Sequence, residues 1–322
     1  MMKFLRNAIV CVCLLSVAYV SDARAYDKDY IGQPETHRAV YEDTFVKIAR
    51  NHGLGFVEMR AANPDLDPWI PGAGAKIKLP KRHLLPEAPR DGIIINLPEM
   101  RLYFFPKDGE PVSYPIGIGR DGLATPEGTT KVTRKKEGPT WRPTSRMRKE
   151  NPELPISVPP GPKNPLGSHA LYLGWPQYLI HGTNKPYGIG RRVSSGCIRL
   201  YPEDIIELFA EVSVKTPVHV VDQPIKAGWV GNEFYVEMHP IKEEADFLEE
   251  NLPLETTRID ENDVAFILEK AADRAEHLDW DSIREAAKKR QGYPVMVASR
   301  PQKDKQNQMQ KTKTATDIIE VR

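Results

Sequence analysis

One stretch of the chain, residues 181–200, constrains its fold and chemistry more than any other. It reads His-Gly-Thr-Asn-Lys-Pro-Tyr-Gly-Ile-Gly-Arg-Arg-Val-Ser-Ser-Gly-Cys-Ile-Arg-Leu, with His181 first and Cys197 near its end. The apolar run 178–180 before it is typical of a buried strand that carries His181 at its end. Residues 201–209 after it are typical of a helix, with a proline near the start and acids in the first turn. The stretch is therefore a long loop between a strand and a helix.

A His and a Cys joined by a glycine-rich loop form the pair that a thiol nucleophile needs. His181 can take the thiol proton, and the N–H groups of the turn 194–197 can face an oxyanion. Gly196 and the serines before it predict an exposed thiol, whereas a buried, inert cysteine is the structural alternative. Because a helix follows the turn, the sequence also predicts a lowered pKa for Cys197.

The pattern H-G-T-N-x-x-x-G-I-G-x-x-V-S-S-G-C-I-R-L resembles the YkuD-type L,D-transpeptidases, and within them the ErfK/YbiS group. The motif of that family is a His followed, after a gap, by S-x-G-C-x-[RN], and every element is present here. Many members carry S-H-G-C, and Ser195 stands where their second His would be. This departure removes a second imidazole and leaves the nucleophile and the base.

The resemblance implies a role for each motif residue. Cys197 would be the nucleophile, His181 the base, and the carbonyl of Gly182 the group that orients the imidazole ring. The N–H groups of Gly196 and Cys197 would form the oxyanion hole. Substrate contacts would come from Arg199, Ser195 and Thr183. Arg199 could clamp a substrate carboxylate with its fork of donors, or could form a structural ion pair.

The resemblance also implies the reaction. The thiolate would attack the diamino-acid carbonyl of a peptidoglycan tetrapeptide stem and release the terminal D-Ala. An amine would then resolve the thioester, from a second stem to give a 3–3 cross-link or from a lysine of an outer-membrane lipoprotein. Such enzymes are expected to be carbapenem-sensitive. No group of His, Cys and acids has metal-ligand spacing, so the sequence predicts no metal and no other cofactor.

The first residues predict export to the periplasm. Lys3 and Arg6 precede an apolar run at 8–20, and the small-x-small site 23–25 predicts signal cleavage after Ala25. Since the run is too short for a membrane span, no transmembrane segment is expected in the mature chain. Cleavage would also remove the only other cysteines of the chain, and a lone thiol in an oxidising compartment is typical of a reactive group.

The net charge of the chain bears on whether it binds nucleic acid. Cleavage would remove three cations and one acid, so the formal net charge would move from +1 to −1. Such a balance does not favour nucleic acid as a partner.

The segment 36–82 predicts a small α/β domain with the order strand, helix, helix, strand. The expected elements are a strand at 37–41, a helix that Asp43 or Thr44 caps and whose apolar positions are 45, 48 and 49, a helix at 56–62 and a strand at 75–79. Their sequences resemble a LysM module, a fold that binds glycan N-acetyl groups. A small cap without a ligand is the alternative.

Residues 91–222 predict a mainly β catalytic domain. Short apolar runs and many prolines indicate a sandwich or barrel, and the YkuD family has such a fold. The expected strands are 93–96, 102–105, 112–118, 131–133, 170–173 and 218–221. Residues 223–300 predict an α+β appendage with a strand at 233–237 and helices at 264–275 and 280–290. Residues 301–322 are polar and predict a disordered tail.

Other protein classes remain open at this stage. A papain-like or NlpC-type peptidase places its Cys before its His, whereas His181 comes first here. A sortase separates its Cys and Arg by a long gap, whereas Arg199 is two residues after Cys197. A cysteine peptidase or L,D-carboxypeptidase acting on stem peptides would use the same residues with water as acceptor. A wall-binding LysM protein with an inactive catalytic domain is the non-enzymatic alternative.

Overall fold

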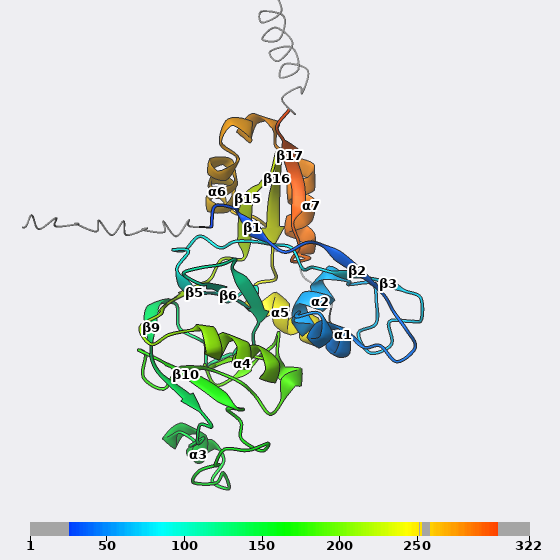
Figure 1. Ribbon diagram of the computed structural model, residues 1–322. Helices are drawn as coiled ribbons and strands as arrows, with labels where there is room; N and C mark the ends of the chain where they lie inside the picture. The colour runs from blue at the N-terminus through cyan, green and yellow to red at the C-terminus, as the bar shows by residue number, and fades with distance from the viewer. Residues whose placement is uncertain (1–25, 251, 253–257, 302–322) are drawn as a thin grey trace, which may run out of the picture.

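The computed structural model describes residues 26–250, 252 and 258–301 (Figure 1). The predicted signal peptide, 1–25, and the predicted tail from residue 302 onward lie outside the described residues. Within the ranges that are described, no helix has the length and apolar character needed to cross a membrane.

The N-terminal part has the predicted order of two strands around two helices. Its elements are β2 (Glu35–Arg38), α1 (Phe45–Asn51), α2 (Phe56–Ala62) and β3 (Lys76–Leu79), after a short β1 (Tyr30–Ile31) that pairs with β4 (His83–Leu84). β2 and β3 are antiparallel, with Glu35 opposite Leu79. Of the two predicted caps, Thr44 accepts the N–H of Lys47 at 3.2 Å and begins α1.

An eight-stranded sheet forms the centre of the protein, in the order β13-β11-β10-β9-β14-β5-β6-β7. In chain order its strands are β5 (Gly92–Asn96), β6 (Arg101–Phe105), β7 (Val112–Pro115), β9 (Gly128–Glu137), β10 (His169–Leu173), β11 (Leu179–His181), β13 (Ile198–Arg199) and β14 (Pro217–Val221). β5 runs parallel to β14, and β11 runs parallel to β13. The prediction of a mainly β catalytic domain is confirmed.

Both faces of this sheet are covered. Ile93, Ile94 and Ile95 in β5 are all fully buried, Ile93 and Ile95 in the main core and Ile94 in a smaller cluster on the other face. α4 (Pro202–Glu211) packs on β10 and buries Ile205 and Leu208. A continuous apolar run such as that of β5 is what a strand buried on two sides requires.

The single strand predicted at 112–118 is wrong, because the chain forms two short strands there. β7 ends at Pro115, and β8 (Ile118–Gly119) pairs with β12 (Arg192–Ser194) in a separate small sheet. Proline has no N–H to donate to a neighbouring strand. After it, the N–H of Gly117 donates to the carbonyl of Arg199 at 2.8 Å, which ties this corner to the strand that follows Cys197.

The C-terminal part contains the predicted strand and helices and three elements that the sequence did not predict. β15 (Ile225–Val230), β16 (Glu233–Met238) and β17 (Val295–Ser299) form a sheet packed against α6 (Glu261–Ala271) and α7 (Trp280–Lys289), at the opposite end of the molecule from α3 (Ser145–Glu150) (Figure 1). α5 (Lys242–Glu249) packs on α2. The helix predicted at 264–275 ends early, because Ala272 has φ 50° and starts a 3-10 turn (Ala272–His277).

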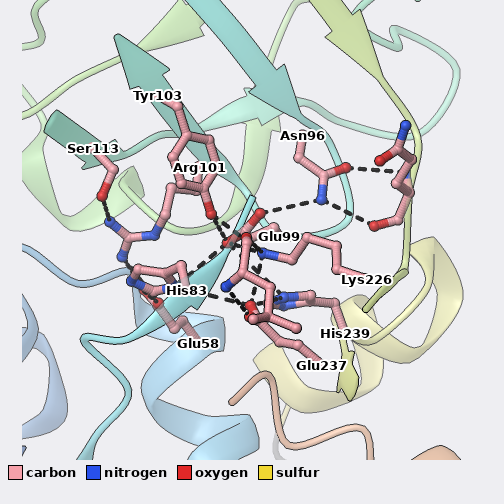
Figure 2. Close-up of polar contacts among 12 residues, drawn as sticks. Glu58, His83, Asn96, Glu99, Arg101, Tyr103, Ser113, Lys226, Glu237 and His239 are labelled. Carbon is pink, nitrogen blue, oxygen red and sulfur yellow. Dashed lines mark hydrogen bonds and ion pairs between the residues drawn. The ribbon is translucent and has the colours of Figure 1, made fainter. Parts of the chain in front are cut away.

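A buried polar cluster joins the three parts of the chain (Figure 2). Glu58 of α2 pairs with Arg101 of β6 at 2.7 Å. The ammonium of Lys226 in β15 lies 2.8 Å from a carboxylate oxygen of Glu99, between β5 and β6, and 2.8 Å from one of Glu237 in β16. The side chains of these five residues are at most 4% exposed. Buried ion pairs therefore link the N-terminal, central and C-terminal parts.

Candidate active site

His181 and Cys197 lie on the wall of one cavity of about 750 Å³. His181 is the last residue of β11, and Cys197 lies in the turn between β12 and β13. Because β13 runs parallel to β11 with Arg199 opposite His181, the strand pairing brings the turn to the end of β11. Residues sixteen apart in the sequence thus share one edge of the sheet.

The ring of His181 is held by the next residue in the chain. Its Nδ1 donates to the carbonyl oxygen of Gly182 at 2.6 Å, which leaves Nε2 as the nitrogen that can accept a proton. Burial, reinforced by the positive charge of Arg199, lowers the pKa of His181 to about 4, although the carbonyls of Gly182 and Leu166 partly offset this shift. At neutral pH the imidazole is neutral, as a general base must be.

The turn that carries Cys197 is fixed by short polar contacts. The Oγ of Ser194 accepts the N–H of Gly196 at 3.1 Å and donates to the carbonyl of Cys197 at 2.6 Å. The hydroxyl of Thr125 donates to the carbonyl of Gly196 at 2.9 Å. Gly196 has φ 102°, and a Cβ there would come within 2.9 Å of the Tyr178 ring, so only glycine fits.

The predicted lowering of the Cys197 pKa is wrong. The thiol is half-buried and donates to the carbonyl of Gln177 at 3.4 Å, and burial raises its pKa. The backbone of Leu179 and the charge of Arg199 oppose this effect only in part. The predicted helix starts at Pro202, and β13 intervenes, so its N-terminus is not next to the thiol. At neutral pH the resting pair is therefore a thiol and a neutral imidazole.

The other motif residues divide between the cavity and its surroundings. Ser195 and Arg199 line the cavity. Thr183 lies instead at a second hollow of about 420 Å³, where its Oγ accepts the N–H of Lys185 at 2.9 Å. The N–H of Gly196 is occupied by Ser194, so the N–H of Cys197 is the better candidate for an oxyanion donor.

Arg199 is a cation without a structural counter-ion. No ion pair joins it to a carboxylate among the described residues, and its buried Nε has no hydrogen-bond partner there. Burial lowers its pKa, which reflects the cost of holding an unpaired charge away from water. The alternative of a structural ion pair is therefore not realised within these residues. A bound carboxylate would satisfy the guanidinium.

Three residues that are far apart in the sequence bring donor atoms of the kind that bind metals close together. Donor atoms of His83, Glu99 and Glu237 lie within 4.8 Å of one another in the buried cluster (Figure 2). Lys226 is already 2.8 Å from both carboxylates, and a cation bound there would be repelled by its ammonium. The donor set therefore does not fit a metal while Lys226 is charged, and we assign none.

The sequence did not reveal several residues that line the cavity. Arg134 of β9, Tyr172 of β10, Arg142 just before α3 and Arg146 within α3 line the cavity as well. The segment with α3 has no strong apolar period, so no pattern predicted its position. Register in the sheet and the packing of a loop decide these contacts.

Known proteins resemble this chain over much of its length. The sequence profile of YkuD, the L,D-transpeptidase catalytic domain, matches residues 90–220. Two proteins of Escherichia coli (strain K12), the probable L,D-transpeptidases YbiS and ErfK/SrfK, are 41% identical over 263 residues and 39% identical over 264 residues. The alignments cover 78% of this chain in both cases, 82% of YbiS and 81% of ErfK/SrfK. The catalytic domain of the Enterococcus faecium L,D-transpeptidase aligns at 25% identity with a TM-score of 0.34, over 42% of this chain and all of that one.

Proposed function

This chain belongs to the L,D-transpeptidase family, and we propose that Cys197 is the nucleophile of its acyl transfer and His181 the general base. As an L,D-transpeptidase it acts on peptidoglycan. The observation that carries the assignment of residues is that one cavity wall holds Cys197, a neutral His181 with a fixed tautomer, and an unpaired Arg199. A nucleophile, a base and a carboxylate-binding cation are what cleavage before a terminal amino acid requires.

The resting protonation states define the first step. Nε2 of His181 takes the thiol proton as Sγ of Cys197 attacks the carbonyl carbon of the diamino acid in the stem. The N–H of Cys197 donates to the oxyanion that forms. The bond to D-Ala breaks, and the imidazolium returns its proton to the leaving amine. The result is a thioester at Cys197 and free D-Ala.

The second half of the reaction passes the acyl group to an amine. His181, neutral again, removes a proton from the acceptor amine as it attacks the thioester carbonyl, and the thiol is regenerated. The likeness to the ErfK/YbiS group favours a lysine of an outer-membrane lipoprotein as acceptor. A second stem, giving a 3–3 cross-link, is the other acceptor. Water in this position would make the enzyme an L,D-carboxypeptidase.

Donor selection provides the test of this assignment. We expect Arg199 to bind the carboxylate of the terminal D-Ala, so a tetrapeptide stem should lose D-Ala and a pentapeptide stem should not. Mass spectrometry of both muropeptides after incubation measures this directly. Arg199→Ala should raise KM more than Arg199→Lys, whereas Arg284→Ala, at an exposed arginine of α7, should behave as wild type. Equal use of the pentapeptide would remove the assignment of the tetrapeptide donor.

The N-terminal part is proposed to hold the enzyme on the wall as a LysM-like module, after export to the periplasm. Trp69 and Tyr187, 57% and 72% exposed, line a hollow of about 450 Å³ between this part and the loop after His181. Aromatic faces beside polar groups suit a glycan. Trp69→Ala should weaken sacculus pull-down and leave turnover of a soluble muropeptide intact, and Tyr41→Ala is a matched control because Tyr41 is exposed and lies outside this hollow. Unchanged pull-down by Trp69→Ala would contradict glycan binding here.

A further inference from the structure

The active-site cavity carries charge of one sign. Four arginines line it, Arg134, Arg142, Arg146 and Arg199, and none of the described residues on its wall is an aspartate or glutamate. Cations gathered around one cavity repel each other and raise its positive potential. Such a site favours a ligand with several negative charges over a neutral one.

The guanidinium groups of Arg134 and Arg142 are free to bind a ligand. The guanidinium carbon of Arg134 lies over the ring of Tyr172, 3.6 Å from its centroid, and Arg134 is exposed, so its N–H groups can reach a ligand in the cavity. Arg142 is exposed and forms no hydrogen bond or ion pair with another described residue. Arg146 differs, since Glu150 already pairs with it at 2.6 Å.

The sheet register sets the distance between Arg134 and the nucleophile. Arg134 lies opposite Tyr172, and Tyr172 lies opposite Leu179. Cys197 comes directly before β13, whose Ile198 lies opposite Ile180, and the backbone of Leu179 forms a hydrogen bond with the thiol. Three steps of about 4.8 Å between neighbouring strands put the backbone of Arg134 about 14 Å from that of Cys197. The guanidinium of Arg134 lies over the ring of Tyr172, one strand nearer to the thiol. Three stem residues precede the scissile bond, and they extend about 10 Å at about 3.3 Å per residue, so they fit within this span.

We propose that the cavity selects donor stems by their ionised carboxylates, with Arg134 and Arg142 binding the free carboxylates of the stem residues on the donor side of the scissile bond. This inference rests on the proposed function, because it concerns the donor of the same reaction. A stem with a free glutamate carboxylate and a free diamino-acid carboxylate has charges that match this wall. A stem whose carboxylates are amidated leaves the arginines without partners and is a poor donor.

Two synthetic tetrapeptide donors test the proposal, one with free side-chain carboxylates and one with the same groups amidated. D-Ala release gives kcat/KM for each, and intact mass gives the acyl-enzyme. The full chain should prefer the free donor by about tenfold or more, the effect of a charge-assisted hydrogen bond. Arg134→Gln should reduce that preference several-fold, Arg134→Lys should reduce it less, and high salt should weaken it.

Lys149→Gln provides the matched control, because Lys149 is an exposed cation of α3 that does not line the cavity. It should leave the preference at the wild-type value. Equal kcat/KM of the wild-type enzyme for the two donors, or an unchanged preference in Arg134→Gln, would overturn the inference while leaving the transpeptidase assignment intact. Failure of both donors to acylate Cys197 would instead overturn the proposed function and this inference with it.

Discussion

Replacing Lys226 with methionine tests how strongly the buried polar cluster holds the three parts of the protein together. The ammonium lies 2.8 Å from carboxylate oxygens of both Glu99 and Glu237, and the three side chains are at most 1% exposed. Methionine keeps an unbranched chain and removes the charge, so it leaves two buried carboxylates without this counter-ion. Breaking one buried pair costs about 3–5 kcal/mol, and the double loss should reach the upper part of that range.

The pKa shifts of the two carboxyls give the pH dependence of this effect. Burial raises the pKa of Glu99 and Glu237, but the attraction of Lys226, together with the contacts of His83 and His239 to Glu99 and of His239 to Glu237, outweighs it and holds both below their usual value. A carboxyl whose pKa is depressed on folding stabilises the protein above its unfolded pKa of about 4.3. That contribution disappears as the pH falls through the folded values. The difference between wild type and Lys226→Met should therefore be full at pH 7 and shrink in acid.

Urea unfolding followed by tryptophan fluorescence measures the difference at each pH. Arg50→Ala is the matched control, because the ion pair of Arg50 with Glu203 is two-fifths exposed or more and should contribute about 1 kcal/mol or less. If Lys226→Met were as stable as Arg50→Ala at pH 7, the buried ion pairs of the cluster would not hold the three parts of the chain together.

Two further predictions concern the catalytic pair. Because the pKa of His181 is about 4, kcat/KM should hold its plateau well below pH 6.5 and fall only as His181 becomes protonated near pH 4; a pH–rate profile checks this, and an acid limb near 6.5 would contradict the buried environment. Because burial raises the pKa of Cys197, iodoacetamide should alkylate it more slowly at pH 7 than free cysteine, as intact mass over time would record; faster alkylation would mean that the thiolate is already present.

The sequence predicted what depends on neighbours along the chain. The strand before His181, the helix after Cys197 and the glycine turn are all local patterns of apolar period, proline and glycine. The pair itself could be predicted because one loop carries both residues. The pKa of Cys197 could not, since it depends on how deeply the folded protein buries the thiol.

Contacts that depend on sheet register could not be predicted from the sequence. Only the pairing of the sheet puts Arg134 opposite Tyr172 and Tyr172 opposite Leu179, whose backbone forms a hydrogen bond with the thiol of Cys197. The same holds for Glu99 and Lys226, which are far apart in the sequence and meet where two sheets adjoin. No periodicity in a single segment encodes such pairs.

In the proposed mechanism, Cys197 carries the acyl group of the donor stem. Incubation of the full enzyme with a tetrapeptide muropeptide, without an acceptor amine, followed by intact-mass measurement and peptide mapping, tests it directly. We expect one adduct with the mass of the stem less D-Ala, mapped to Cys197, absent in Cys197→Ala and formed much more slowly in His181→Ala. An adduct on another residue, or D-Ala release by Cys197→Ala, would contradict it.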